Sequence, residues 1–399
     1  MAWKETCRVD EREKFVKAYL DTGAMSALCR EFGISRKTGY KWAGRYFDKG
    51  AEGLEDLSRR PLSSPTAVEQ WMIDGLVRAR KEYPFFGPRK LRAFLVKRNP
   101  GLELPAPSTI GEILRRHGLV RPRKRRRGVP PATQPFGQCS QPNDVWCTDF
   151  KGHFPVGDGL RCYPLTLTDA MSRYLLRCDG VTSPDEPTVK PIFESAFREF
   201  GLPSAMRSDN GPPFASTGLA RLSRLAVWWV RLGIRLERIE PGHPEQNGRH
   251  ERMHRTFKQE TASPPEVSLP RQQRTFDRFR RRYNDERPHE ALGQVTPASV
   301  YTPSARPFPD KLPEVEYPVG YELRRVQHNG VIRWRGHSPF LTQCLDQEIV
   351  GLKEVDFDRW HIYFGPLFLG LLDERGHFPK IVVPRKKPPK KTLLPISSV

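Results

Sequence analysis

The sequence predicts a multidomain protein with helical units at the N-terminus, a central α/β domain and a small all-β barrel at the C-terminus. Three observations carry this prediction. Apolar side chains recur at helical spacing up to residue 120, and strand-like and helix-like runs alternate from residue 143. Residues 315–384 are rich in β-branched and aromatic side chains with repeated Gly and Asp turn signals, and 399 residues suffice for two to four domains.

Charge narrows the class of partner. Lys and Arg number 67 against 46 Asp and Glu, which gives a net charge of +21 and favours nucleic acid over a merely basic soluble or ribosome-associated protein. No run of 18 apolar residues predicts a membrane span, and no signal peptide is expected. Seven scattered cysteines without a Cys-x-x-Cys pair indicate a reducing compartment rather than a disulfide frame or a structural zinc site.

Residues 1–60 predict three short helices. The first has Phe15, Tyr19 and Leu20 on one apolar face. Ser26 is expected to cap the second helix, and Ser35 is expected to cap the third, because a serine hydroxyl there accepts a hydrogen bond from a backbone N–H that the helix leaves unpaired.

The third of these helices is basic. A helix, a Gly-containing turn and a basic helix are typical of a helix-turn-helix, whose last helix enters the major groove of DNA; a plain three-helix bundle is the alternative. Ile34 and Trp42 are expected to pack inward. The residues expected to contact DNA are Arg36, Lys37, Tyr40, Lys41 and Arg45.

Residues 61–120 predict a second helix-turn-helix-like unit. Ser108 is expected to cap a helix whose apolar face holds Ile110, Ile113 and Leu114. The preceding helix is basic through Lys90, Arg92, Lys97 and Arg98.

A basic linker follows at 121–140. Like charges at this density cannot pack into a core, so the segment is a solvated linker or an arm lying on phosphates. A second basic segment, the tail at 385–399, is expected to be attracted to polyanions. The linker residues expected to contact DNA are Arg123, Lys124, Arg125, Arg126 and Arg127.

Residues 141–305 predict a mixed sheet flanked by helices, because three strands are followed by alternating helices and strands. The strand-like runs are 145–150, 161–168, 173–181, 204–208 and 235–239. The helix-like runs are 187–200, 216–231, 246–260 and 270–285.

Three acidic residues stand out in this domain. Asp149 ends the first strand-like run, Asp209 ends another ahead of an Asn-Gly turn, and Glu251 lies in a helix. Singly, each is an ordinary capping, turn or helix-start residue. Together, two strands and a helix can bring their carboxylates to a pair of divalent ions, and hard oxygen ligands favour Mg²⁺ or Mn²⁺ over zinc.

The third acidic residue has a rival. Glu245 follows Asp209 by 36 residues and Glu251 follows it by 42, so spacing does not choose between them. Glu251 is favoured because Arg255 and Lys258 follow at i+4 and i+7 on the same helical face, where they can meet phosphates, whereas Glu245 follows a proline in an expected loop.

The order of these motifs resembles the catalytic core of retroviral-type integrases and bacterial insertion-sequence transposases. The first histidine is His117, so an N-terminal zinc module is excluded and the resemblance points to the bacterial branch. The Asp209-to-Glu251 interval is longer than in many relatives, implying a longer connection. The segments that carry the resemblance are 146–149 (WCTD), 208–211 (SDNG), 244–258 (PEQNGRHERMHRTFK), 283–292 (YNDERPHEAL) and 296–297 (TP).

The resemblance implies a ribonuclease H-like core in which Asp149, Asp209 and Glu251 hold two Mg²⁺ or Mn²⁺ ions. It implies two phosphoryl-transfer steps, cleavage at an element end and joining of the freed 3′-hydroxyl to target DNA. His254, Arg255 and Lys258 would hold phosphates. The expected partners are element ends, target DNA and further copies of the chain, in a cytoplasmic, nucleoid-associated protein of bacteria without membrane contact.

Two other functions remain open. One is a DNA-binding regulator without catalysis, and the other is a nuclease on the same fold that cleaves but does not join. In the C-terminal barrel, Arg324, Arg325, Arg333 and Arg335 around Trp334 suit DNA or a second protomer, and a folding or multimerisation role is as plausible.

Overall fold

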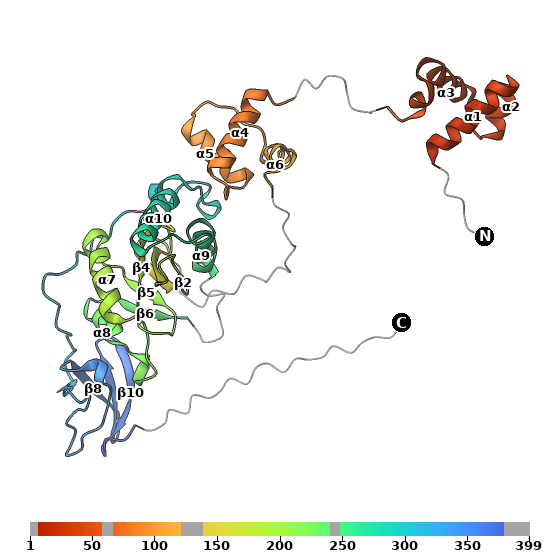
Figure 1. The fold of residues 1–399 in the computed structure, drawn as a ribbon. Coiled ribbons are helices and arrows are strands. Elements are labelled where there is room, and N and C mark those ends of the chain that lie inside the picture. Colours follow the sequence, from red (N-terminus) through yellow and green to blue (C-terminus); the bar gives the residue numbers. More distant parts are fainter. Residues whose placement is uncertain (1–6, 58–66, 121–138, 240–247, 379–399) are drawn as a thin grey trace, which may run out of the picture. The chain divides into compact units, whose positions relative to one another are not determined.

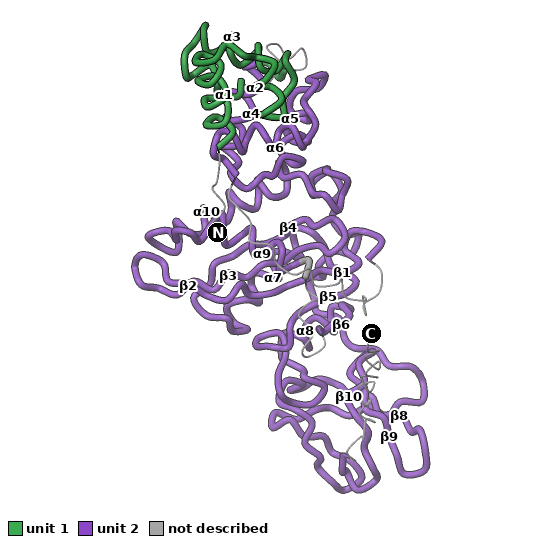
Figure 2. The backbone as a smooth tube through the Cα atoms, turned by 90° about the vertical axis from the view of Figure 1, so that its right-hand side faces the viewer, with its two compact units in different colours: residues 1–69 green, residues 70–399 purple. Residues whose placement is uncertain are grey.

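The computed structural model divides into two compact units, Met1–Glu69 and Gln70–Val399 (Figure 2). Several predicted features lie outside the described residues: the linker up to residue 138, the tail 385–399, Glu245, and the DNA contacts expected from Arg123 through Arg127. The structure describes residues 7–57, 67–120, 139–239 and 248–378.

The first unit is the predicted three-helix arrangement. Ser35 caps the third helix as predicted, accepting a hydrogen bond from the backbone N–H of Thr38 at 3.1 Å. Trp42 is buried as predicted, beside Phe15 of the first helix. The helices are α1 (Arg8–Thr22), α2 (Met25–Glu31) and α3 (Arg36–Lys49), followed by the 3₁₀ turn η1 (Gly50–Leu54).

Two details of the first unit were predicted wrongly. Ser26 does not cap α2, because the helix already begins at Met25 and Ala24 occupies the cap position without a side-chain hydrogen bond. Leu20 is 49% exposed rather than part of the apolar face, whereas Phe15 is buried. Both errors concern a shift of one or two positions along the helix.

The second unit opens with three more helices. Ile110, Ile113 and Leu114 are buried as predicted. Ser108 is not the cap, because Pro107 starts the helix one residue earlier, where its fixed φ suits the first helical position. The helices are α4 (Gln70–Glu82), α5 (Pro88–Arg98) and α6 (Pro107–Arg116).

The second unit contains a central sheet, coloured yellow to green in Figure 1. Its middle strand is β1. β1 pairs antiparallel with β3 and parallel with β5, and β5 pairs parallel with β6, while β2 and β4 both pair with β3. The strands are β1 (Val145–Phe150), β2 (Phe154–Pro155), β3 (Arg161–Asp169), β4 (Leu175–Val181), β5 (Ala205–Ser208) and β6 (Arg235–Arg238).

Helices bury apolar side chains on this sheet in two separate clusters. One cluster joins Trp146 of β1 to Phe193 and Phe197 of helix α7 and to Trp229 of helix α8. The other joins strands β3 and β4 to α9 and α10, with Phe257 packed against Phe276 at 4.8 Å. The helices are α7 (Glu186–Phe200), α8 (Arg224–Arg231), α9 (Gly248–Thr261) and α10 (Leu269–Arg281).

The helix predicted over 216–231 is half as long in the structure. Ser223 caps α8 by accepting a hydrogen bond from Ala226, so the helix begins at Arg224. A short 3₁₀ turn, η2 (Leu219–Arg221), precedes it, and Ala220 has φ +49° inside that turn, a conformation that a helix cannot continue through.

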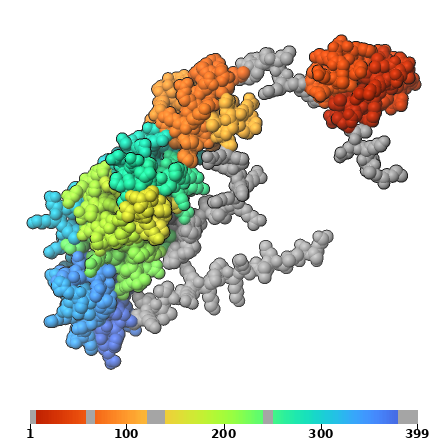
Figure 3. Space-filling view, in the orientation of Figure 1, coloured from red at the N-terminus to blue at the C-terminus, as the bar shows by residue number. Residues whose placement is uncertain are grey.

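The segment after α10 joins the central domain to helices α4 to α6. Asn284 lies in the π-helical turn η4 (Arg282–Glu286), and its side chain bonds both the N–H and the carbonyl of Leu175 on β4, at 2.8 and 3.0 Å. Tyr83, from the end of α4, donates a hydrogen bond to Glu286 at 2.6 Å. Figure 3 shows the resulting contact between the orange and teal surfaces.

The C-terminal region is all-β, as predicted. Its strands form a four-stranded antiparallel sheet in the order β10-β9-β8-β7, with β7 and β10 as edges within the described residues, where the sequence predicted a barrel. Its core includes Trp334 and Trp360 together with Ala226 and Val227 of α8. The strands are β7 (Glu322–Arg325), β8 (Ile349–Asp356), β9 (Arg359–Phe364) and β10 (Leu367–Asp373).

Candidate active site

Asp149 and Asp209 stand at the carboxyl ends of neighbouring parallel strands, Asp149 as the penultimate residue of β1 and Asp209 directly after β5. Cys147 of β1 pairs with Arg207 of β5, and each aspartate comes two residues later in the chain. Because strand side chains alternate with a period of two, both carboxylates are expected at the carboxyl edge on one face. The backbone N–H of Gly211 donates to Asp209 Oδ1 at 3.2 Å, so the predicted Asn-Gly turn also fixes this carboxylate.

Glu251 lies in the first turn of α9 and is exposed. Met253 and Phe257, on the inner side of α9, are buried in the cluster shared with β4 and α10. Arg255 and Lys258 are exposed, as predicted for the face that carries Glu251. The helix is therefore held by its apolar side and presents one carboxylate and two cations to solvent.

The three acidic residues share one electrostatic field. Burial, with smaller contributions from the negative charges of Asp209 and Glu251, raises the pKa of Asp149 to about 7. The backbone N–H of Phe150 and the charge of Lys151 oppose this rise. Burial also raises the pKa of Asp209. Carboxylates that repel one another in this way gain most from a bound cation, which restores their charged form.

Two buried histidines of α9 lie directly behind Asp149. The Nε2 atoms of His250 and His254 lie 2.8 and 2.7 Å from the Thr166 hydroxyl on β3, and His254 Nδ1 lies 3.6 Å from Asp149 Oδ2. Thr168 Oγ1 lies 3.1 Å from His250 Nδ1. Thr166 is the cross-strand neighbour of Asp149, so these contacts tie α9 to the strand pair that bears the first acidic residue.

Both imidazoles are neutral near pH 7. Burial lowers the pKa of His250 to about 3, and it lowers the pKa of His254 still further. The hydroxyl of Thr166 has one proton, and its acceptors are the backbone carbonyl of Asp149 at 3.2 Å and the two Nε2 atoms. At least one of the two rings must therefore carry its own proton at Nε2.

His254 does not lie where the sequence predicted. It was expected to hold phosphates, but it is only 2% exposed and contacts Asp149 and Thr166 instead. His250 was not predicted as a site residue at all. The available signal was the spacing of four between the histidines, on the same side as the apolar Met253 and Phe257.

A mixed donor set also meets at this point. One ligand atom each from Asp149, His250 and His254 lies within 4.8 Å of the others. The ring nitrogens of His250 already face Thr166 and Thr168, and one nitrogen of His254 faces Thr166, so this set has few free donors. The oxygen donors of the three acidic residues fit a hard divalent cation better.

The predicted DNA-contacting residues of α3 form one solvent face. Arg36, Lys37, Tyr40 and Lys41 are exposed. Arg45 is half-buried, with its guanidinium 5.0 Å from the Trp42 ring. The first four are accessible to a ligand, and Lys41, like Arg45, also lies against the Trp42 ring, at 4.8 Å.

Trp334 of the C-terminal sheet is a core residue. It is 1% exposed, packs on Trp360 at 5.1 Å, and has Arg324 and Arg335 beside its ring. It is therefore not a surface platform for a base, which removes one argument for DNA binding at this sheet. No helix within the described residues has the length and apolar character of a membrane span.

Family comparisons agree with this architecture. The description "Integrase core domain" applies to matches over residues 140–244 and 232–297. A "Helix-turn-helix domain" matches residues 11–61, and a "Homeodomain-like domain" matches residues 38–114.

Similar proteins come from insertion elements and retroviruses. The "Insertion element IS407 uncharacterized 31.7 kDa protein" of Burkholderia multivorans is 26% identical over 69% of this chain and 93% of that protein. The "Insertion element IS476 uncharacterized 39.2 kDa protein" of Xanthomonas euvesicatoria is 28% identical over 62% of this chain and 69% of that protein. The Gag-Pol polyprotein of Baboon endogenous virus is 32% identical over 30% of this chain and 6% of that protein.

Solved structures with some likeness are viral integrases. The HTLV-2 integrase catalytic core domain in complex with magnesium has a TM-score of 0.33 and 16% identity, covering 41% of this chain and all of that chain. An intasome of simian T-cell lymphotropic virus in complex with PP2A regulatory subunit B56 gamma has a TM-score of 0.36 and 15% identity, covering 71% of this chain and 91% of that chain.

The central domain of this protein is an integrase core, preceded by helix-turn-helix and homeodomain-like helices. Together with the likeness to two insertion-element proteins, these matches support a relationship of the chain to insertion-sequence transposases of the integrase-like superfamily.

Proposed function

We propose that this protein is a DNA transposase that binds the ends of an insertion sequence and catalyses metal-dependent 3′-end cleavage and strand transfer into target DNA. The observation that carries the proposal is that Asp149 and Asp209 stand at equivalent positions, two residues beyond a residue pair of the adjacent parallel strands β1 and β5. The helix that bears Glu251 contacts the same end of β1, with His254 Nδ1 3.6 Å from Asp149 Oδ2. Three acidic residues from separate segments would thus share a site in a protein of net charge +21, which suits chemistry on a polyanion.

Asp149, Asp209 and Glu251 would hold two Mg²⁺ or Mn²⁺ ions. Bound there, such ions supply Lewis-acid activation and neutralise the charge that develops on phosphoryl oxygens. The fit rests on the chemistry of three carboxylate donors, and the charges of Asp209 and Glu251 contribute to the raised pKa of Asp149. His254 holds the Asp149 side of the site from behind, through its contact at 3.6 Å.

The chain's other charged residues bind and orient DNA in this proposal. Arg255 and Lys258 lie one and two turns after Glu251 on α9 and are exposed, so they can hold phosphates next to the acidic site. In another part of the protein, the exposed face of α3 binds DNA through the base edges of the major groove. The basic linker contributes contacts to the phosphate backbone. Joining requires two ends to be held together, so we propose that the protein acts as a homo-oligomer on DNA.

The test is strand transfer with a labelled, pre-cut element end taken from the DNA that flanks this gene. Joining is expected with Mg²⁺, and it is expected to be absent with EDTA and in Glu251→Gln. Glu186→Gln is a matched control, because Glu186 also stands in the first turn of a helix but lies outside the site.

The outcomes separate the competing functions. Activity of Glu251→Gln equal to that of the control would remove Glu251 from the trio, and loss in Glu245→Gln alone would move the site there. An uncut end is assayed beside the pre-cut one, so that cleavage can be observed. Binding to verified ends without cleavage or joining would favour the regulator, and cleavage of the uncut end without joining would favour the nuclease.

A further inference from the structure

The solvent-facing side of α10 carries a row of four arginines, here named the arginine stripe: Arg271, Arg274, Arg278 and Arg281. Their spacing of three, four and three residues places them on one side of the helix, and all four are exposed. The stripe spans about 15 Å of helix at 1.5 Å per residue. The buried side of α10 holds Gln272, Phe276 and Phe279.

The neighbouring polar side chains of α10 have structural partners. Gln272 donates to the carbonyl of residue 261 at 2.8 Å and accepts from the N–H of residue 266 at 2.9 Å. Gln273 bonds the backbone of β4 at residues 178 and 180, and Arg280 donates to the carbonyl of residue 176 at 2.6 Å. These three side chains explain how α10 is attached to the domain.

The arginine stripe takes little part in that attachment. Within the part of the chain that the structure describes, the only ion pair of the stripe joins Arg278 to Glu266, at a loose 3.9 Å. Arg278 also donates to the Thr275 hydroxyl at 2.9 Å. The fold therefore leaves most of this positive charge without a counterion from the described residues.

Such a stripe works against the stability of the helix. Arginines three and four residues apart repel one another, and Arg271 stands in the first turn, where the helix dipole disfavours a cation. The dipole favours Arg278 and Arg281 in the last turn, so the unfavourable contributions are the repulsion and the position of Arg271. A second copy of the chain docked through the same face would bring two stripes together and add to the repulsion. A polyanion bound along the stripe would instead reduce the repulsion among the arginines and neutralise Arg271.

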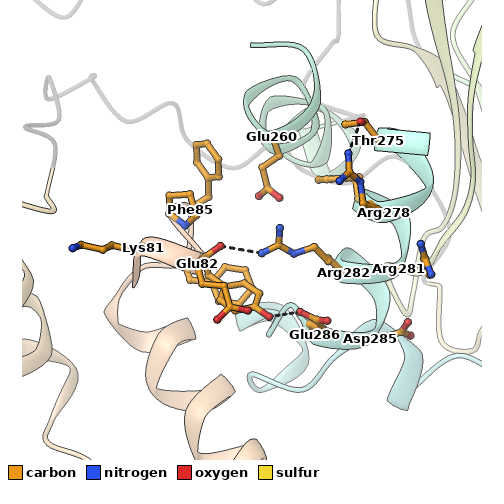
Figure 4. Close-up of a pocket in the computed structure, with 14 residues that line it drawn as sticks. Lys81, Glu82, Phe85, Glu260, Thr275, Arg278, Arg281, Arg282, Asp285 and Glu286 are labelled. Carbon is orange, nitrogen blue, oxygen red and sulfur yellow. Dashed lines mark hydrogen bonds between the residues drawn. The ribbon is translucent and has the colours of Figure 1, made fainter. Parts of the chain in front are cut away.

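The position of the stripe indicates which polyanion. α10 packs beside α9, which carries Glu251, Arg255 and Lys258. Arg278 and Arg281, at the C-terminal end of the stripe, line a cleft of about 570 Å³. The opposite wall of the cleft includes Lys81 at the end of α4 and residues of the turn after it. Figure 4 shows Arg282 reaching across this cleft, where it donates to the carbonyl of Glu82 at 3.1 Å.

We propose that the arginine stripe binds the phosphate backbone of the duplex element end, in the stretch between helices α4 to α6 and the acidic site. This inference rests on the proposed function, since it assumes that the homeodomain-like helices hold the element end. The stripe contacts phosphates and not base edges, so it adds affinity without sequence preference. Its contribution must be sensitive to salt, because each phosphate contact releases counterions.

The experiment measures binding of the full-length chain to a labelled duplex from the gene's flank, across a series of salt concentrations in EDTA. The plot of log K against log salt has a negative slope, and the double variant Arg274→Gln, Arg281→Gln should make it shallower by about 2, at about 0.9 for each lost phosphate contact. Replacing the same two residues by lysine should restore the slope. Arg198→Gln combined with Arg224→Gln, two exposed arginines of α7 and α8, is the charge-matched control and should leave the slope unchanged.

Two results would overturn the proposal. One is equal slopes for the stripe variant and the control. The other is unchanged end binding with loss only in the capture of a second, arbitrary duplex by the chain already bound to an end, which would assign the stripe to target DNA. Binding in EDTA does not depend on catalysis, so a protein that never joins ends would contradict the proposed function while leaving the result on the stripe intact.

Discussion

The Nδ1 atom of His254 lies 3.6 Å from Oδ2 of Asp149, and its Nε2 atom lies 2.7 Å from the hydroxyl of Thr166. The imidazole thus connects the acidic residue of β1 to a threonine directly across from it on β3. Because both ends of the ring are engaged, the orientation of Asp149 depends on residues that never meet the substrate.

Thr166→Val is expected to destabilise the fold and to slow strand transfer. The change keeps the shape but leaves ring nitrogens of His250 and His254 without their partner, at a cost of about 1–3 kcal/mol in the free energy of unfolding. Urea unfolding measures the first effect and strand transfer the second. Thr148→Val is the control, since the Thr148 hydroxyl is buried without a partner within the described residues and its loss should cost nothing. Equal stability of the two variants would contradict this role.

The free energy of unfolding is expected to fall in acid, because His250 is held in its neutral form in the folded protein. Its pKa is about 3 in the fold against 6.5 ordinarily, so the stabilisation is present above pH 6.5 and is lost as pH falls toward 3. The pKa of Asp149 is raised from 3.8 to about 7, so the protonated Asp149 has the opposite effect: its contribution to stability grows as pH falls from 7 to 3.8.

Comparing the wild type with His250→Gln separates the two groups, because Asp149 is present in both. The difference in unfolding free energy between them should shrink by up to about 1.4 kcal/mol per pH unit as pH falls from 6.5. Parallel curves from pH 7 to 4 would show that His250 has no such shift.

Asp149→Asn is expected to abolish strand transfer while leaving element-end binding intact. Without metal, the variant should be at least as stable as the wild type, because it removes the repulsion from Asp209 and Glu251. Added Mg²⁺ should raise the melting temperature of the wild type only, with a stabilisation of about 2.7 kcal/mol at a hundred times the Kd.

Asp169→Asn is the matched control for that experiment. Asp169 is buried on β3 and accepts hydrogen bonds from the backbone N–H of Asn143 and from both the N–H and the hydroxyl of Ser172. Its replacement should lower the free energy of unfolding while keeping the shift with Mg²⁺. A shift retained by Asp149→Asn would place the metal elsewhere.

Asn284→Ala is expected to cost about 3 kcal/mol, because it leaves the N–H and the carbonyl of Leu175 without partners in a buried position. The exposed Asn99, which bonds only its own helix, provides Asn99→Ala as the control. Thermal and urea unfolding should give the same loss of stability. A variant as stable as the control would show that the two hydrogen bonds of Asn284 do not hold segment 283–292 on β4.

The central strands were predicted well because they are short apolar runs ended by polar residues. β1 has the predicted limits 145–150, and both Asp149 and Asp209 lie at the strand ends where they were expected. Helix starts were less predictable. Serines at 26 and 108 look like caps in the sequence, but in each case the helix begins one residue earlier, and Pro107 supplies the reason only for the second.

His254 shows what periodicity alone does not decide. It lies three residues after Glu251 and four after His250, so the sequence is compatible with either face of the helix. The burial of the ring is decided by Thr166, which is 88 residues away in the sequence. A tertiary contact of this range leaves no local signal for the partner, so the spacing of four between His250 and His254 indicated a shared side of the helix but not what that side contacts.

Helix α8 belongs to two hydrophobic cores at once. Trp228 and Trp229 pack into the core of the central sheet, while Ala226 and Val227 pack into the core of the C-terminal sheet, and Arg231 bonds Glu348 across the junction. A chain cut before the C-terminal sheet would therefore leave an apolar strip of its catalytic domain open to water. Loss of activity after such a deletion would therefore reflect destabilisation of the catalytic domain. Point substitutions on the outer surface of the C-terminal sheet are needed to test whether that sheet has a separate function.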